Sequence, residues 1–491
     1  MPRSEGETVS ICSDVDFEIL SYEHGSSVVV IPGGMTWVKT SATGQFIIES
    51  LQRRPRPLAA LIEDVARHYQ LPGERVAAGV RRLVEELIKV GVAECGPGYD
   101  RDFTVTTMDS LGLQEVWYNL TDRCNLSCRF CYVPSIGPSG THAPAELVLR
   151  VIEEAAEMGV RHLLLAGGEP TLHPDLPRIA QHARRQGSLR IKLVTNGSWR
   201  DDVLADHVLS CVDDLQVSLD GAQEEVHDRV RGRGAFRRAV ELLGSVRRQG
   251  YGGAVGISFT PLPSNLDQLT GLYRLALAVG ADYLHLNRPK VPGRRAAEYE
   301  GNGGIASAAW FARALEAYDQ LLLHAYRDQE LAAGLTGRRA VNIDISFDPG
   351  SQLFSPIKRH RCAAGVLTVC IGPDGNCYPC AALCRGEFSW GSVAEESLPS
   401  VYGRMREAMQ GLFDVERDEE CRNCLYRYFC GGGCRASGGL QHRDPACDLL
   451  KRRYHSCLGH VTDVRAAGFS SPTSREASTE GARGFAVPSG C

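Results

Sequence analysis

The sequence lacks three features that would assign it to a large class of proteins. It has no marked excess of charge, because 54 Lys and Arg residues stand against 59 Asp and Glu residues and leave a net charge of −5. A chain so close to balance gives no indication of binding nucleic acid. Its apolar runs end well before the roughly 20 residues of a membrane-spanning helix, and its first residues, MPRSEGE, are unlike a secretory signal peptide. We therefore expect a cytoplasmic protein with no nucleic acid and no membrane among its partners.

Cysteine, in contrast, is plentiful and unevenly placed. The chain has 18 cysteines in 491 residues, and in a cytoplasmic protein such a number favours metal binding over disulfides. Three lie within residues 124–131 and ten within residues 362–447. The length predicts more than one domain, at roughly 100–200 residues each. We interpret the remaining cysteines as buried or incidental thiols: Cys12, Cys95, Cys211, Cys457 and Cys491.

Residues 15–96 have the pattern of a small separate domain. Short apolar runs separated by turn residues predict three strands, and apolar residues at helical spacing predict three helices after them. This order is typical of a winged helix. A DNA-binding role is weakly supported, because glutamates balance the basic residues of the last helix. The strands are expected at 16–20, 27–31 and 35–39, and the helices at 42–52, 58–69 and 74–90.

Residues 116–293 alternate between short apolar strands and helices. Repeated βα units of this kind predict an α/β domain with a parallel sheet, covered by helices and at least partly closed. Functional residues of such barrels lie at the carboxyl ends of the strands. A helix-rich bridge is expected at 294–345 and a disordered tail at 461–491. The strands are expected at 116–121, 162–166, 191–195, 215–219, 255–259 and 283–286.

Three cysteines follow the first of these strands at the spacing Cys124-x3-Cys128-x2-Cys131. Three soft sulfur ligands in one loop can hold three irons of a cubane cluster. The fourth iron then has no protein ligand in the loop, and an open metal position is typical of a catalytic site. A zinc site would need a fourth ligand, and the next histidine, His142, lies beyond a segment rich in Pro and Gly. Disulfides are the other alternative, but three cysteines cannot all pair.

This loop resembles that of the radical S-adenosylmethionine (AdoMet) superfamily, in which an aromatic residue precedes the third cysteine, as Phe130 does here. The resemblance implies a 4Fe–4S cluster whose open iron binds AdoMet, and cleavage of AdoMet to a radical that abstracts hydrogen from carbon. The cofactors supply this chemistry and the protein supplies position and exclusion of water. It also implies a partial (β/α)6 barrel of the TIM type and places Phe130 and Tyr132 beside AdoMet.

Further motifs lie at later strand ends. Gly167-Gly168-Glu169-Pro170 follows the second strand, 36 residues after Cys131, and resembles the family motif that holds the AdoMet amino group. The resemblance also implies that three later residues line the AdoMet ribose and carboxylate: Asn196, Ser218 and Arg231. A solvated loop charge is the alternative for Arg231, and His227 is expected to be structural.

The second group of cysteines contains CxxC pairs, and the spacing from Cys421 is C-x2-C-x5-C-x3-C. Repeated soft ligands in tight turns predict a metal site, with zinc as an alternative to iron. The group resembles the SPASM extension, expected here at 346–460, which carries two auxiliary 4Fe–4S clusters. For the first cluster the resemblance implies Cys362, Cys380 and Cys434, with the fourth position left to Cys370, Cys377 or Cys384, or open; Cys377 is included among the expected ligands. For the second it implies Cys421, Cys424, Cys430 and Cys447.

Fused to such a barrel, the N-terminal domain resembles the PqqD-like recognition element of maturases that act on ribosomally made peptides. The resemblance implies that the leader of a precursor peptide adds a strand to the edge at 35–39, against the helix at 74–89. We therefore predict a radical AdoMet enzyme that forms a thioether or carbon–carbon crosslink in a peptide, with flavodoxin or ferredoxin as electron donor. Epimerisation, oxidative decarboxylation and formylglycine formation are the alternatives, the last weakened by Ala381, where sulfatase maturases carry Asp. A metal-binding winged-helix regulator is the alternative outside the enzymes.

Overall fold

The computed structural model describes residues 7–464, apart from 14, 23–25, 96–105, 129, 132–139, 200–206, 289–307, 334–340, 346–351, 353–354 and 356. Tyr132 and residues 465–491 of the expected tail lie outside the described residues. Residues 461–464 were predicted to be disordered, but they continue the last helix, α16 (Cys447–Val464).

The N-terminal domain has the three strands and three helices that the sequence predicts. Its antiparallel sheet has the order β2-β3-β4, and the Ser41 hydroxyl caps the first helix by accepting a hydrogen bond from the Gly44 amide. A second small sheet, β5-β1-β6, was missed. Strand β1 has four residues and buries only Val9, so its sequence shows no alternation of buried and exposed positions. With β1 included, the domain begins near residue 8 rather than at residue 15. The bounds are β1 (Thr8–Ile11), β2 (Glu18–Ser21), β3 (Ser26–Ile31), β4 (Thr36–Ser41), β5 (Arg56–Pro57), β6 (Ala93–Cys95), α1 (Ala42–Arg53), α2 (Leu58–Tyr69) and α3 (Gly73–Lys89).

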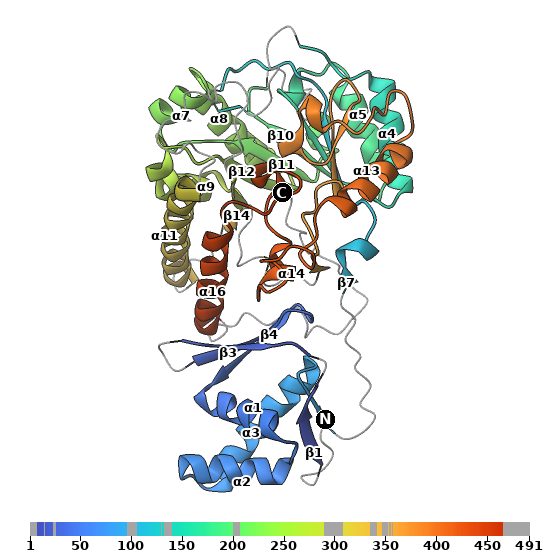
Figure 1. Ribbon diagram of the computed structural model, residues 1–491. Coiled ribbons are helices and arrows are strands. Elements are labelled where there is room, and N and C mark those ends of the chain that lie inside the picture. Colours follow the sequence, from blue (N-terminus) through green and yellow to red (C-terminus); the bar gives the residue numbers. More distant parts are fainter. Residues whose placement is uncertain are drawn as a thin grey trace.

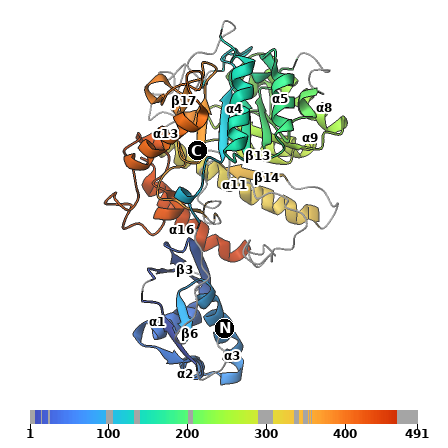
Figure 2. The same cartoon turned by 90° about the vertical axis from the view of Figure 1, so that its right-hand side faces the viewer.

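Both faces of the β2-β3-β4 sheet are covered. Val29 and Val38 pack into the domain's own core, whereas Val28 and Trp37, on the opposite face, belong to the large core of the rest of the chain. Figures 1 and 2 show why: α16 lies across β3, so the C-terminal helix covers the outer face of the wing. The alternation of apolar residues on β3 therefore serves two cores at once.

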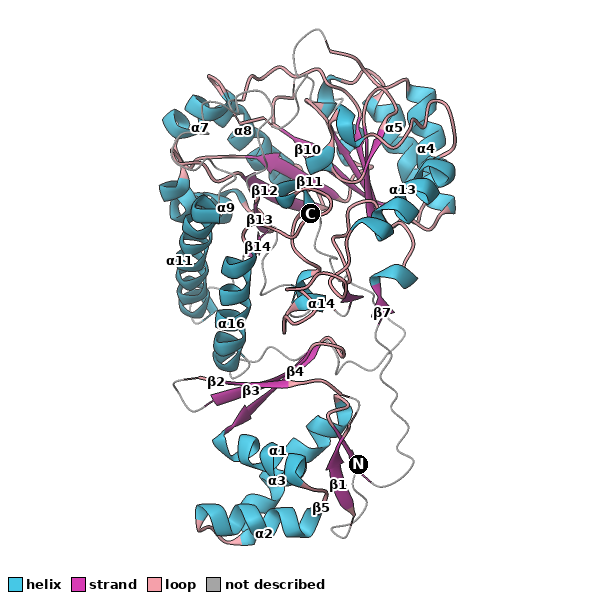
Figure 3. Cartoon of the chain, viewed as in Figure 1, coloured by secondary structure: helices cyan, strands magenta, loops and turns pink. Residues whose placement is uncertain are grey.

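The central domain is a partial, unclosed barrel, called the barrel below. It has a sheet of seven parallel strands, β8 to β14, with helices outside it (Figure 3). The six expected strands are confirmed. The seventh, β14, lies in the segment predicted to be a helical bridge, which therefore contains one long helix and one strand. The bounds are β8 (Glu115–Asn119), β9 (His162–Ala166), β10 (Arg190–Thr195), β11 (Asp214–Ser218), β12 (Ala254–Phe259), β13 (Tyr283–Leu286), β14 (Asn342–Ile345), α4 (Ala145–Glu157), α5 (Leu176–Arg185), α7 (Glu224–Arg231), α8 (Ala235–Arg248), α9 (Leu269–Val279) and α11 (Ala308–Ala333).

The C-terminal domain extends the same sheet. Strand β16 pairs in parallel with β8, and β17 pairs antiparallel with β16. Among the described strands, β14 and β17 are therefore the two edges of this nine-stranded sheet. The cysteine-rich domain is thereby joined rigidly to the strand that precedes Cys124. The remaining elements are β7 (Thr106–Thr107), β15 (Ile357–Lys358), β16 (Thr368–Ile371), β17 (Cys377–Tyr378), α13 (Leu398–Leu412), α14 (Arg427–Cys430) and α15 (Arg435–Gly438), with short 3₁₀ helices at Met108–Ser110, Pro170–Leu172, Leu266–Gln268, Ala381–Leu383 and Gly386–Phe388.

Candidate active site and cluster-binding sites

One cavity lies at the carboxyl ends of the parallel strands, where the sequence places the site. Its walls come from the ends of β8 to β13 and from the cysteine loop. The structure brings most of the predicted residues to this cavity: Cys124, Cys128, Phe130, Cys131, Gly167, Gly168, Asn196, Ser218 and Arg231.

The three cysteines of the loop are gathered on one side of the cavity. Cys124 is buried, and the Leu126 amide donates to its sulfur at 3.4 Å. The pKa of Cys124 is raised to about 12, chiefly by burial and also by the negative charges of Glu169 and the two neighbouring thiols, while the Leu126 amide opposes the shift. Three cysteines this close together, one of them buried, repel one another when ionised, so as thiolates they need a cationic partner. They fit an iron–sulfur cluster with one iron that has no protein ligand.

Gly167 and Gly168 are required by the backbone that precedes these cysteines. Gly167 has φ +132°, and a Cβ there would lie 2.4 Å from the Thr121 carbonyl oxygen. A Cβ on Gly168 would lie 2.2 Å from the Arg123 carbonyl oxygen. The Gly168 amide instead donates to Thr121 at 2.7 Å. The two glycines therefore hold the start of the cysteine loop against the end of β9.

Glu169 lies behind the cavity wall. Its carboxylate is fully buried and accepts hydrogen bonds from the Thr195 hydroxyl at 2.7 Å and the Asn196 amide at 2.7 Å, and from the hydroxyl and amide of Thr171. Burial raises the pKa of Glu169, and these donors oppose the shift. The carboxylate thus ties the end of β9 to the end of β10, and Pro170 begins the short helix that follows. Direct contact between Glu169 and AdoMet stays a prediction.

Asn196 connects this network to the cluster loop. Its side-chain nitrogen, Nδ2, donates to Oδ1 of Asn125 at 2.9 Å and lies 3.9 Å from the Cys124 sulfur. Its side-chain oxygen accepts from the Ser198 amide at 2.9 Å. Both ends of the side chain are therefore fixed, which orients it toward the loop.

Arg231 is a buried residue of the cavity wall, unlike the solvated charge that was the alternative. It ends α7 and pairs with Asp220, and its guanidinium lies 5.2 Å from the Phe130 ring centre. Burial alone lowers the pKa of Arg231, but Asp220 and Cys128 outweigh it and raise the pKa above its ordinary value. His227, which the sequence predicts to be structural, is fully buried, and its Nδ1 accepts from the Asp220 amide at 3.0 Å.

Sequence reasoning did not assign roles to several polar residues that line the cavity or, like Asp220, lie behind its wall. Asp220 is fully buried and accepts from the Thr260 amide at 2.7 Å. Asn287 donates to the Ser258 hydroxyl at 2.8 Å. Their position in the sequence could have identified them, because Asp220 and Asn287 each directly follow a predicted strand. The cavity residues that were not singled out include Trp117, Gln216, Ser258, Thr260, Asn287 and Arg288.

A second cavity gathers the four cysteines expected to bind one auxiliary cluster. Cys421, Cys424, Cys430 and Cys447 all line it, with Tyr426 and Tyr454 stacked beside them at 5.0 Å. Burial raises the pKa of all four thiols, that of Cys430 to about 12. The glycines between Cys430 and Cys434 all have positive φ, of 61°, 77° and 77°. They make the sharp turn that the sequence predicts.

The cysteines of the other expected cluster are buried close by. The Gly365 amide donates to the Pro379 carbonyl at 2.8 Å, which joins the segments that carry Cys362 and Cys380. Burial is the main reason that the pKa of Cys434 is raised. The negative charge of the nearby Cys362 thiolate raises it as well, so the two thiols are close together. The three thiols are a donor set that fits an iron–sulfur cluster, and their role as its ligands stays a prediction.

The structure separates the three candidates for the fourth ligand. The Asn119 amide nitrogen lies 3.4 Å from the Cys370 sulfur and 3.6 Å from that of Cys384, so these two are neighbours. Cys377 pairs with Ile371 and therefore lies on the opposite face of the hairpin from Cys370. Its sulfur is directed to the Gly375 carbonyl at 3.8 Å. The geometry favours Cys370 or Cys384 over Cys377, whose role as a ligand stays a prediction.

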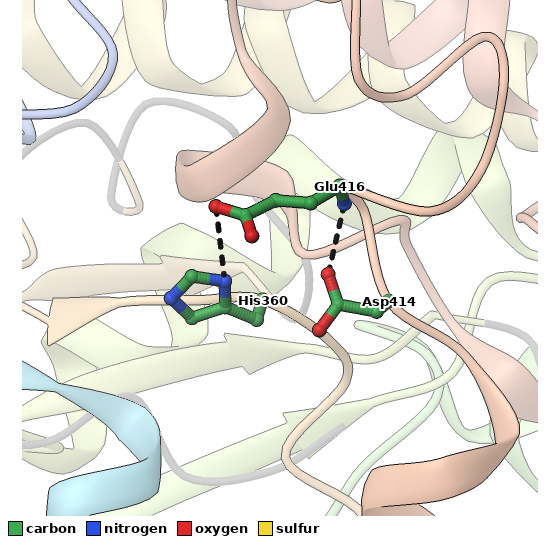
Figure 4. Close-up of side chains that lie close together, drawn as sticks. All are labelled: His360, Asp414 and Glu416. Atoms are coloured by element: carbon green, nitrogen blue, oxygen red, sulfur yellow. Dashed lines mark hydrogen bonds and ion pairs between the residues drawn. The ribbon is translucent and has the colours of Figure 1, made fainter.

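A group of three potential ligands, His360, Asp414 and Glu416, lies elsewhere in the same domain (Figure 4). Its atoms already have partners. Asp414 pairs with Arg361 at 2.8 Å and accepts from the Glu416 amide at 2.8 Å. The Glu416 carboxylate accepts from the Tyr428 hydroxyl at 2.5 Å and lies 3.7 Å from His360. We interpret the group as a set of internal contacts that close the loop after α13.

Family models match three segments of the chain. They are the radical SAM superfamily over residues 118–276, coenzyme PQQ synthesis protein D (PqqD) over 26–93, and the SPASM iron–sulfur cluster-binding domain over 362–425. The chain is therefore a radical SAM enzyme with an N-terminal PqqD domain and a C-terminal SPASM domain. These domains imply 4Fe–4S clusters and AdoMet, which the cysteines described above fit. None of the described helices has the length and apolar character needed to cross a membrane.

Individual proteins are similar to this chain over two thirds of its length or more. The mycofactocin maturase MftC of Mycolicibacterium smegmatis is 29% identical over 340 residues, which are 67% of this chain and 81% of the relative. The crystal structure of Streptococcus suis SuiB bound to the precursor peptide SuiA has a TM-score of 0.53 at 14% identity and covers 90% of this chain and 100% of SuiB. The structure of anSMEcpe with bound AdoMet has a TM-score of 0.55 at 16% identity, over 73% and 97% of the two chains. The structures confirm the expected fold class, and the MftC match agrees with the expected family of peptide maturases.

Proposed function

We propose that this chain is a maturase that binds the leader of a ribosomally made precursor peptide and crosslinks its core, through a thioether or a carbon–carbon bond. The observation that carries the proposal is the fusion of an open-edged recognition domain to the cavity of a radical SAM enzyme. In the described part of the chain, β4 pairs with β3 alone, so its other side is available for an added strand. Helix α3 packs near this strand, as the sequence predicts for a leader groove.

The names of the relatives support a peptide substrate. MftC is described as a maturase, and SuiB was crystallised with a precursor peptide. In this chain Gly167, Gly168, Asn196, Ser218 and Arg231 would hold AdoMet against the cluster on Cys124, Cys128 and Cys131. When bound, these cofactors supply a radical that removes one hydrogen atom from the peptide.

Crosslinking then requires an oxidant. One hydrogen atom of the peptide passes to the radical, and the new bond forms as the peptide loses a proton and one electron. The clusters expected on the Cys362 and Cys421 groups are the proposed acceptors of that electron. We further propose that flavodoxin or ferredoxin supplies the electron that starts each turnover, and that the enzyme works in the cytoplasm, where its thiols stay reduced.

Epimerisation is the second candidate, and one observation favours it. Cys370 is fully buried and pairs across the sheet with Trp117, which lines the cavity. Where Cys384 completes the auxiliary cluster, the Cys370 thiol beside this wall could return a hydrogen atom to a peptide radical. Formylglycine formation is less well supported, because Ala381 is a buried apolar residue where that reaction would use a carboxylate.

The test uses anaerobically purified full chain with the short peptide encoded beside its gene. We expect 5′-deoxyadenosine from AdoMet and dithionite, and a peptide product that has lost two hydrogens. A peptide without its leader is the matched control and should be modified poorly. Unchanged peptide mass with inverted chirality would support epimerisation instead. A colourless zinc protein that binds DNA would overturn both.

A further inference from the structure

Arg288 connects the barrel cavity to the cysteine-rich domain. It follows β13 and lines the cavity, and its side chain is only 8% exposed. Its guanidinium lies 4.3 Å from the centre of the Phe311 ring, on α11. The side chain is thus held from one side by a helix of the barrel.

The partner of Arg288 on the other side is Asp444, 156 residues later in the chain. The two form a paired contact, with Nη1 2.5 Å from Oδ2 and Nη2 2.9 Å from Oδ1. The Asp444 side chain is 1% exposed. A buried ion pair costs desolvation on both sides and is weak evidence of stability by itself. Its place in the molecule is more informative.

Asp444 stands between two of the expected cluster ligands, Cys434 and Cys447. Its Oδ2 accepts from the Cys434 amide at 2.9 Å and its Oδ1 accepts from the Ala446 amide at 2.9 Å. Its backbone carbonyl accepts from the Cys447 amide at 3.0 Å. Asp444 therefore fixes the backbone at expected ligands of two different clusters: its carboxylate holds the Cys434 amide, and its backbone carbonyl holds the Cys447 amide.

The local packing leaves this carboxylate little freedom. A Cβ on Gly433 would lie 2.3 Å from the Asp444 Cβ, so the turn between Cys430 and Cys434 is pressed against it. The Asp444 amide donates back to the Gly432 carbonyl at 3.1 Å. Arg288 is the cation placed to neutralise the carboxylate, and it comes from the cavity wall.

We propose that Arg288 and Asp444 are a positioning pair that fixes the loops of both auxiliary clusters against the barrel cavity, and that their opposite charges set the reduction potential of the cluster held by Cys434. Charges and hydrogen bonds around cluster sulfurs are known levers on that potential. The inference rests on the proposed function only in placing a cluster on Cys434. It adds a route by which the cavity and the auxiliary clusters affect each other.

The test is a charge cycle in the full, reconstituted chain, read by redox titration of the auxiliary-cluster EPR signal without peptide. In R288Q a carboxylate is left unpaired beside Cys434, so adding an electron becomes harder. We expect the equilibrium constant for reduction to fall about tenfold, or about 59 mV for one electron. In D444N a guanidinium is left unpaired, and a rise of about the same size is expected. R288Q/D444N should return toward the wild-type value.

Two further variants keep the test decisive. R288K retains the charge without the paired geometry and should keep the wild-type potential. R453Q removes another largely buried arginine of this domain, which pairs with Asp319 on α11 at 2.6 Å, and should lower stability without moving the potential. Shifts of R288Q and D444N in the same direction, or no shift in either, overturn the proposal. Absence of any auxiliary signal in the wild type would instead count against the proposed function.

Discussion

The two cysteine regions of this protein are built in different ways. The expected ligands of the barrel lie within eight residues after one strand, whereas those expected in the C-terminal domain are spread over residues 362–447. The first set is held by neighbouring strand ends, through Gly168 and Asn196. The second set depends on glycine turns and on a side chain from the barrel, Arg288. A local motif can therefore specify one site, while the other needs the whole fold.

The largest effect is expected from removing ligands of the two regions in turn. Cys124→Ala should abolish AdoMet cleavage, with a loss beyond the roughly 10- to 100-fold typical of changes around a metal ligand. Cys421→Ala should leave most of the cleavage and stop formation of the peptide product. Both are measured as 5′-deoxyadenosine and as product mass. Equal loss of cleavage in the two variants would contradict the division of roles.

The pH dependence of stability is expected to arise in the barrel. Burial lowers the pKa of His227 to about 4, against about 6.5 in an unfolded chain. Between these values the unfolded chain binds more protons than the folded chain. The contribution of neutral His227 to stability is therefore fully present above about pH 6.5 and is lost as the pH falls toward 4. The loss from pH 7 to pH 5 should be about 2 kcal/mol.

Thermal unfolding at both pH values measures this loss. In His227→Asn the new side chain can still accept a hydrogen bond from the Asp220 amide but does not titrate, so the variant should flatten the pH dependence of stability. His442→Asn, on the exposed surface of the C-terminal domain, is the matched control. An unchanged pH slope in the first variant would show that the titrating group lies elsewhere.

Two glycine substitutions should separate the regions. Gly168→Ala forces a Cβ against the Arg123 backbone, and Gly433→Ala places one against Asp444 at φ +77°. Each should cost about 1–3 kcal/mol, the first with loss of iron from the barrel site and the second from the auxiliary sites. Iron content and the EPR signals of each cluster measure the outcome. Gly79→Ala in α3, where a Cβ meets nothing within 4 Å, should stabilise the chain by about 0.4–1 kcal/mol.

The smallest effect is expected where the N-terminal domain meets α16. The Tyr22 hydroxyl donates to the His455 carbonyl at 2.9 Å, and Tyr22→Phe removes that bond at a cost of about 1 kcal/mol. The variant should be cleaved faster by protease between the domains, while AdoMet cleavage without peptide stays at the wild-type level. Unchanged protease resistance would show that the wing is held by its apolar face alone.

Much of this protein was determined by local sequence. The spacing of Cys124, Cys128 and Cys131 and the glycines of the next strand end predict the radical site, because neighbouring parallel strands bring their carboxyl ends together. The alternation of apolar segments predicts the barrel strands and the winged domain, because burial of one face imposes a period of two or of 3.6 residues.

Only the tertiary structure decided the rest. Strand β14 and the small β1 sheet were too short for a period to be detected, and the addition of β16 to β8 depends on packing between domains. The pairing of Arg288 with Asp444 and the separation of Cys377 from Cys370 follow from register and chain crossing. Arg288 and Asp444 are 156 residues apart, and no local pattern encodes which distant partner a buried charge will meet.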